Sequence, residues 1–132
     1  MTIAVDTNVW VRYLTWDHEA QARTAGEVIE GADAIAVPTI ILCELAWVLK
    51  RAYRYATGEI VDAISDIARA DTVSVDRPAV AAGLDALRAG ADFADGVIRF
   101  EAERARCQRM YTFDQGFAQA SDPAKVILLG AA

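Results

Sequence analysis

Short, uniformly apolar segments alternate along the chain with longer segments in which apolar residues recur every three or four positions. The short segments lie at 2–5, 34–37, 72–75, 110–113 and 126–129. Their lack of polar alternation predicts strands buried on both faces, as in a parallel sheet. The longer segments lie at about 8–15, 19–30, 40–53, 57–69, 78–89 and 92–106. Because these segments predict helices, we expect an α/β fold: an α/β/α sandwich around a short parallel sheet.

Capping and breaking residues delimit these elements. Asn8 and Thr39 are suitable N-caps for the first and third helices. Gly31 and Gly90 follow helical segments, as C-terminal glycines do. Pro38 ends the second strand, because it cannot donate to a sheet ladder.

The length and composition predict one soluble cytoplasmic domain spanning residues 1–132. The chain has 132 residues, of which 55% are apolar, so a hydrophobic core can form without disulfide bonds or structural metal ions. The longest apolar run breaks at Glu44, so no membrane segment is expected. Asp6 precedes any apolar region of a signal peptide. Cys43 and Cys107 lie far apart without a CxxC motif, which argues against a disulfide framework or a zinc ribbon.

The charge is acidic: 13 Lys and Arg against 19 Asp and Glu give −6. This argues against a basic coat protein for nucleic acid. Basic residues still gather in two stretches, where most are expected to be solvated. They are Lys50, Arg51 and Arg54, then Arg99, Arg104, Arg106 and Arg109.

Two acids directly follow predicted strands, Asp6 after 2–5 and Asp114 after 110–113. In open α/β sheets, ligands bind beyond the carboxyl ends of the strands. The simpler alternative is that both acids cap the following turns.

Glu44 has only apolar neighbours three and four positions away on its helix: Ile40, Ile41, Trp47 and Val48. The helix therefore predicts a carboxylate that is buried or at a cleft wall, with Trp47 in the core. A buried charge requires a cation or a metal ion. A salt bridge to a distant Arg, or a neutral hydrogen-bonded Glu44, is the alternative.

Asp92 and Asp95 lie one turn apart at the start of a predicted helix. Asp92 suits the N-cap and Asp95 suits the first turn. The row through Asp95 contains Ala91, Ile98 and Ala102, which predicts that Asp95 faces inward.

If these acids converge at one end of the sheet, a divalent cation relieves their repulsion. The single histidine, His18, lies in a polar loop and is expected to be solvated. Carboxylate ligands without histidine favour Mg²⁺ or Mn²⁺ over zinc.

Four segments together carry a resemblance to a known family. They are Ile-Ala-Val-Asp-Thr-Asn-Val at 3–9, Ile-Leu-Cys-Glu-Leu at 41–45, Ala-Asp-Phe-Ala-Asp-Gly-Val-Ile at 91–98 and Tyr-Thr-Phe-Asp at 111–114. In this order and spacing the chain resembles the PIN-domain ribonucleases, most closely the VapC-type toxins of bacterial type II toxin–antitoxin pairs. The family usually has Ala-Leu where this chain has Gly96-Val97, a minor departure because no ligand is lost.

The resemblance implies a site residue by residue. Asp6, Glu44 and Asp95 would form the metal site, with Asp114 as a fourth, more variable acid. Asp92 matches less well, so its role as ligand or cap stays open. The groups implied to orient carboxylates or water are Thr7, Asn8 and Thr112.

The resemblance also implies an activity and partners. The reaction would be Mg²⁺- or Mn²⁺-dependent hydrolysis of RNA phosphodiester bonds, with the acids binding metal. A small antitoxin protein would cover the active site of a homodimer.

Three other functions are alternatives to a ribonuclease. A receiver-like signalling domain requires an acid pair at the first strand, whereas Asp6 stands alone and the third strand ends at Asp76 beside Arg77. The lysine expected before its last helix is also missing. A dehalogenase-type phosphatase requires Asp-x-Asp where this chain has Asp6-Thr7-Asn8. A catalytically silent PIN binding module is the other alternative.

Overall fold

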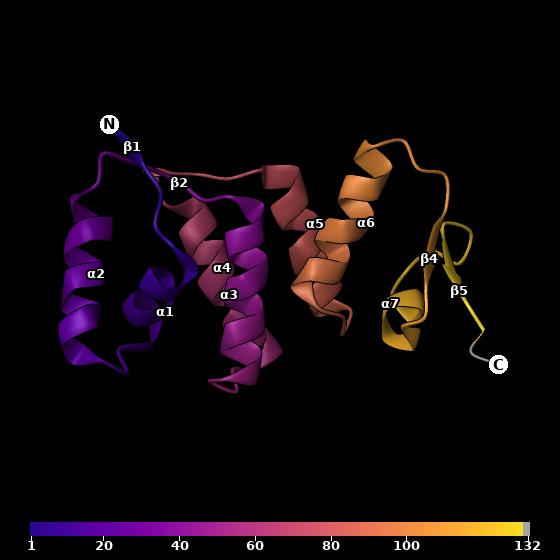
Figure 1. The fold of residues 1–132 in the computed structure, drawn as a ribbon, viewed down its shortest axis with the longest axis horizontal. Helices are drawn as coiled ribbons and strands as arrows, with labels where there is room; N and C mark the ends of the chain where they lie inside the picture. Colours follow the sequence, from indigo (N-terminus) through magenta and orange to yellow (C-terminus); the bar gives the residue numbers. More distant parts are fainter. Residues whose placement is uncertain (131–132) are drawn as a thin grey trace. The chain divides into compact units, whose positions relative to one another are not determined.

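The computed structural model describes residues 1–130, which fall into two compact units. Unit 1 comprises Met1–Arg77, and unit 2 begins at Pro78. Each unit combines helices with parallel strands (Figure 1). The mixed α/β class predicted from the sequence is therefore confirmed.

Unit 1 contains a three-stranded parallel sheet and four helices (Figure 1). Its elements are β1 (Thr2–Ile3), α1 (Thr7–Thr15), α2 (Glu19–Gly31), β2 (Ala34–Ala36), α3 (Thr39–Arg51), α4 (Thr57–Arg69) and β3 (Val73–Ser74). The strand order is β1-β2-β3, with Ile3 and Val73 both opposite Ile35. β2 is thus the central strand, and Ile35 is almost fully buried.

The core of unit 1 forms where the apolar stripes of its helices meet. α4 buries Ile60 and Ile64, one turn apart on one face. α3 buries Leu42, Leu45 and Leu49, and α3 contacts both α1 and α4. Each such side chain contributes about 1.5–3 kcal/mol by leaving water. The position of α3 is therefore fixed by its leucine face.

The described part of unit 2, up to residue 130, contains three helices and one pair of parallel strands. Its elements are α5 (Arg77–Arg88, beginning at the last residue of unit 1), α6 (Phe93–Arg104), β4 (Met110–Thr112), α7 (Gln115–Gln119) and β5 (Val126–Leu128). Met110 pairs with Val126 and Thr112 with Leu128. The short helix α7, which contacts both strands, was not predicted from the sequence.

Two glycines allow close packing of side chains and backbone within unit 2. A Cβ on Gly83 would lie 2.5 Å from the Phe93 ring. A Cβ on Gly96 would overlap the Ala82 carbonyl and lie 2.8 Å from the Ala86 Cβ. The contact between α6 and α5 therefore requires Gly96. The expectation that Gly96-Val97 is a minor departure from the family's Ala-Leu is wrong for packing.

The predicted elements occur close to the expected positions, but several local details differ. Asp6, not Asn8, is the N-cap of α1, and Thr39 is the first residue of α3 rather than its cap. The prediction of strands buried on both faces is wrong for β1, β3, β4 and β5. Thr2 and Ser74 are exposed, and so are Tyr111 and Leu128.

Candidate active site

Asp6 lies between β1 and α1 and caps the helix. Its Oδ1 accepts a hydrogen bond of 2.7 Å from the Thr7 amide. The capping role weighed from the sequence is therefore confirmed for Asp6. The side chain is exposed, and Oδ2 has no hydrogen-bond partner within residues 1–130. One carboxylate oxygen thus remains available to a ligand.

Thr7 connects Asp6 to Glu44. Its hydroxyl donates to Glu44 Oε1 over 3.2 Å, while its amide donates to Asp6. Thr7 is 8% exposed and is the one buried polar residue in the described part of the chain. A single buried residue therefore brings two of the expected metal ligands together.

Glu44 itself is exposed, so the prediction of a buried carboxylate is wrong. Trp47 is 59% exposed and Ile40 is 65% exposed, so the expectation of Trp47 in the core is wrong too. The reason is that α3 has apolar residues on two faces. The face with Leu42 and Leu45 takes the core, which leaves the opposite row of Ile40, Glu44 and Trp47 at the surface.

Asp92 and Asp95 begin α6 in a reciprocal arrangement. Asp92 is the N-cap, and Asp95 Oδ2 accepts a hydrogen bond of 3.1 Å from the Asp92 amide. Asp95 is half-buried, as its helical row predicts, although Ile98 on that row is 46% exposed. Asp95 therefore has a structural role at the helix start as well as a partly enclosed carboxylate.

The pKa of Asp95 is raised above its usual value, chiefly because burial disfavours the charged form. The hydrogen bond from the Asp92 amide opposes this shift. The negative charges of Asp92 and Asp114 raise the pKa further, and the positive charge of Arg99 lowers it. Three carboxylates of unit 2 are thus close enough for electrostatic repulsion.

Asp114 follows β4 and caps α7. Its Oδ1 accepts a hydrogen bond of 3.1 Å from the Phe117 amide, which confirms the capping role weighed from the sequence. The Asp114 amide donates to Thr112 Oγ1 over 3.0 Å. Thr112 therefore holds the turn that presents Asp114.

The other singled-out polar residues lie at the surface. Asn8 is exposed and lines a groove between α1 and α2. His18 is exposed, as predicted, and its Nδ1 caps α2 by accepting from the Gln21 amide over 3.1 Å. Neither residue contacts the acids by a hydrogen bond within the part of the chain that the structure describes.

The arrangement gives two groups of carboxylates, one in each unit. In unit 1, Thr7 donates hydrogen bonds to both Asp6 and Glu44. In unit 2, the charges of Asp92 and Asp114 raise the pKa of Asp95. No three His, Cys, Asp or Glu side chains in residues 1–130 are arranged to hold a metal ion. The donors are carboxylate oxygens, which suit a hard cation, and a cation would relieve the repulsion around Asp95. The residues present therefore fit Mg²⁺ or Mn²⁺ chemically.

The PIN domain family model matches residues 3–123, a range that runs through both units. The chain belongs to the PIN domain family. Comparisons with curated proteins and with solved structures found no match. Membership indicates nuclease activity in general, and nucleases of this family typically use divalent metals. This favours a hydrolase over the receiver-like alternative.

In the described part of this PIN-domain chain, none of the helices has the length and apolar character needed to cross a bilayer.

Arg99 is a residue whose position the sequence analysis missed. It was expected to be a solvated charge, but it is half-buried on α6, one turn beyond Asp95. Its Nη1 donates to the Ala120 carbonyl over 2.8 Å and to Ser121 Oγ over 3.0 Å. The spacing of four residues from Asp95 is the signal that could have placed it near the acids.

Proposed function

We propose that this PIN-domain chain is a Mg²⁺- or Mn²⁺-dependent ribonuclease that hydrolyses RNA phosphodiester bonds, acting as the toxin of a type II toxin–antitoxin pair. The observation that carries the proposal is the double contact of Thr7 with Asp6 and Glu44 in a chain of this family. Two exposed carboxylates held by one buried hydroxyl-bearing residue are an arrangement suited to metal binding.

The proposed ligands are the four acids at the motif positions: Asp6, Glu44, Asp95 and Asp114. Thr7 orients Glu44, and Thr112 fixes the turn at Asp114. Asn8 is proposed to orient a carboxylate or water beside Asp6. Asp92, the N-cap residue of α6, is left out of the proposed ligands, because the family's acid in this helix matches Asp95 better.

A divalent cation held by these carboxylates would supply a water of lowered pKa as nucleophile and would neutralise charge on the phosphoryl group. The chain's carboxylates serve as ligands in this proposal, so no covalent intermediate on the protein is required. The net charge of −6 and the few basic residues favour a short contact with RNA. Single-stranded segments are the proposed targets, because their bases can turn outward.

The toxin assignment rests on the sequence resemblance and on the surface of unit 1. Ile40 and Trp47 are exposed apolar side chains beside Glu44, a composition typical of interaction surfaces. A small antitoxin with a basic segment would complement an acidic chain, and a second copy would form the homodimer. We propose the cytoplasm as the place of action, where RNA is available.

The test is cleavage of a labelled single-stranded RNA pool by the purified chain. Reactions contain Mn²⁺, Mn²⁺ with excess chelator, or Mn²⁺ with the Asp95→Asn variant. Asp62→Asn serves as the matched control, because Asp62 is an exposed carboxylate of α4 outside the proposed ligands. We expect cleavage only by the wild type and the control with free Mn²⁺.

Three outcomes would overturn the proposal or part of it. Cleavage that persists in chelator would exclude the metal-dependent reaction. Full activity of a well-folded Asp95→Asn variant would remove Asp95 from the ligands. A folded chain that binds RNA or an antitoxin but cuts none of the pool would identify a catalytically silent binding module instead.

A further inference from the structure

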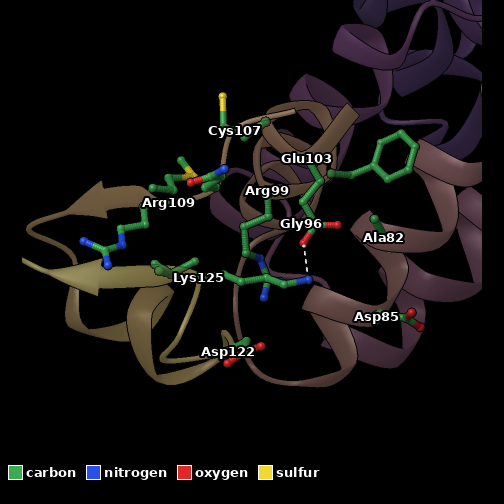
Figure 2. Close-up of a pocket in the computed structure, with 14 residues that line it drawn as sticks. Ala82, Asp85, Gly96, Arg99, Glu103, Cys107, Arg109, Asp122 and Lys125 are labelled. Atoms are coloured by element: carbon green, nitrogen blue, oxygen red, sulfur yellow. Dashed lines mark hydrogen bonds and ion pairs between the residues drawn. The ribbon is translucent and has the colours of Figure 1, made fainter. Parts of the chain in front are cut away.

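Unit 2 contains a cavity of about 280 Å³ formed by residues between 82 and 126. α5 and α6 form one wall, and β4 with the segment leading into β5 forms the other (Figure 2). Phe100, Met110 and Val126 contribute apolar surface, while Arg99 and Arg109 contribute positive charge. This volume lies just below the usual range of small-ligand pockets, which limits an occupant to about the size of one nucleotide unit.

Each acid that lines this cavity already has a partner. Glu103 pairs with Lys125 over 3.4 Å, an interaction that Figure 2 shows across the cavity. Asp85 pairs with Arg88 over 3.5 Å. Asp122 accepts a hydrogen bond of 2.9 Å from the amide two residues further on. None of these three acids forms an ion pair with Arg99 or Arg109 in residues 1–130.

Arg99 retains hydrogen-bonding capacity that the protein does not use. Its two partners, the Ala120 carbonyl and Ser121 Oγ, are neutral acceptors. They and the Phe117 ring, 5.7 Å from the guanidinium carbon, fix the side chain at the cavity. The Nε atom is buried and has no hydrogen-bond partner in residues 1–130. Because Nε is shielded from solvent, an entering anion cannot reach it, but Nη2 forms no hydrogen bond in residues 1–130 and can donate to an anionic acceptor.

Arg109 provides the second positive charge. It is exposed, lines the cavity, and forms no ion pair within the part of the chain that the structure describes. Surface pairs such as Glu103–Lys125 contribute little to stability, so that pair competes weakly with an entering anion. The cavity thus combines an apolar wall with two guanidinium groups that form no ion pair in residues 1–130.

We propose that this cavity binds a backbone phosphate of single-stranded RNA through Arg99 and Arg109. The planar guanidinium group matches phosphate geometry, and the apolar wall accommodates the attached ribose or base. Because Arg99 lies one turn beyond Asp95 on α6, the bound phosphate lies close to a proposed metal ligand. Arg99 and Arg109 are therefore positioning residues for the substrate strand. The inference rests on the proposed function, since it takes RNA as the substrate.

The experiment measures binding of a fluorescent ten-nucleotide single-stranded RNA by anisotropy, in chelator and at several salt concentrations. The variants are Arg99→Gln and Arg109→Gln. The control is Arg23→Gln, since Arg23 is an exposed arginine of α2 paired with Glu19 over 2.7 Å. Circular dichroism confirms the fold of each. Inorganic phosphate and a nucleoside monophosphate are tested as competitors, which distinguishes a free phosphate from a phosphate of RNA.

We expect each of the two variants to bind RNA about 10-fold more weakly. We also expect each to lose about 0.7 of the slope of log affinity against log salt, the loss of one phosphate contact on a single strand. The control should bind as the wild type does. Arg109→Gln keeps the test decisive if Arg99→Gln fails to fold, because Arg109 makes no hydrogen bonds like those that hold Arg99 to Ala120 and Ser121.

Three results would overturn the inference. One is unchanged affinity of both variants, and another is no binding by the wild type. The third is competition by inorganic phosphate or the mononucleotide at the concentrations at which RNA binds, because the site would then take free phosphate. The chelator separates this inference from the proposed function. Arginine-dependent binding without cleavage in Mn²⁺ would reject only the function, whereas cleavage with unaltered binding by both variants would reject only this inference.

Discussion

Thr7 and Glu44 are 37 residues apart in the sequence, and the Thr7 hydroxyl donates a hydrogen bond of 3.2 Å to Glu44 Oε1. The donor is buried and the acceptor is exposed. The bond joins the first residue of α1 to the middle of α3. A buried hydroxyl thus holds one oxygen of a surface carboxylate, an arrangement suited to orienting a metal ligand.

Thr7→Val removes this donor while keeping the shape of the side chain. We expect Mn²⁺ affinity and cleavage to fall about 10-fold, the lower end for loss of a group that orients a ligand. The free energy of unfolding in chelator should change by no more than about 1.5 kcal/mol, the contribution of one hydrogen bond. Titration calorimetry and denaturant unfolding measure the two effects.

The control for this prediction is Thr24→Val, in which the lost hydroxyl donates only to the Ala20 carbonyl of its own helix. Cleavage by this control should equal that of the wild type. A Thr7→Val variant with wild-type metal affinity would show that Glu44 does not depend on Thr7.

Glu44→Gln separates the charge of this residue from its hydrogen bond, because the amide oxygen can still accept from Thr7. We expect Mn²⁺ binding to be lost, since a charged ligand is removed. Stability without metal should stay within about 0.5 kcal/mol, as for an exposed position. Glu27→Gln, an exposed glutamate of α2, is the control. A large loss of stability in chelator would indicate that the carboxylate is part of a structural ion pair instead.

Much of the fold could be predicted from the sequence because the local signals agree with the packing. The isoleucines of α4 recur at helical spacing and do form its buried stripe. α3 shows the limit of this reasoning. Ile40 and Trp47 are as apolar as Leu42 and Leu45, so periodicity could not decide which face meets the core.

Only part of the candidate site could likewise be predicted from the sequence. The positions of Asp6 and Asp114 at strand ends followed from the pattern of the chain, and so did the half-buried Asp95. The bond from Thr7 to Glu44 could not be derived, because it depends on how α1 and α3 meet. Helix α7 was missed, because five residues are too few for a periodic signal.

Gly96→Ala tests the close contact between α5 and α6. The added methyl group would overlap the Ala82 carbonyl, which is backbone and cannot rotate away. We expect a loss of about 1–3 kcal/mol of stability from overpacking, despite the better helix propensity of alanine. Gly58→Ala is the control, since nothing lies within 4 Å of a Cβ there, and it should gain up to about 1 kcal/mol. Equal stability of the two variants in urea unfolding would contradict the close contact.

The fall of the unfolding free energy at low pH should depend on Asp17 and Tyr53. The hydrogen bond from the Tyr53 hydroxyl lowers the pKa of Asp17 below its usual value, helped by Thr15 and by Arg12, 3.1 Å away. A carboxyl group whose pKa is lower in the folded state stabilises the fold above its unfolded pKa, about 3.9. That contribution disappears as the pH falls through the lower folded value. Tyr53→Phe should therefore flatten the fall in unfolding free energy below about pH 4.

Tyr55→Phe is the control, since Tyr55 makes no such bond to Asp17. Identical acid limbs for the wild type and Tyr53→Phe, measured by urea unfolding at a series of pH values, would show that the Tyr53 hydroxyl does not hold the pKa of Asp17 down.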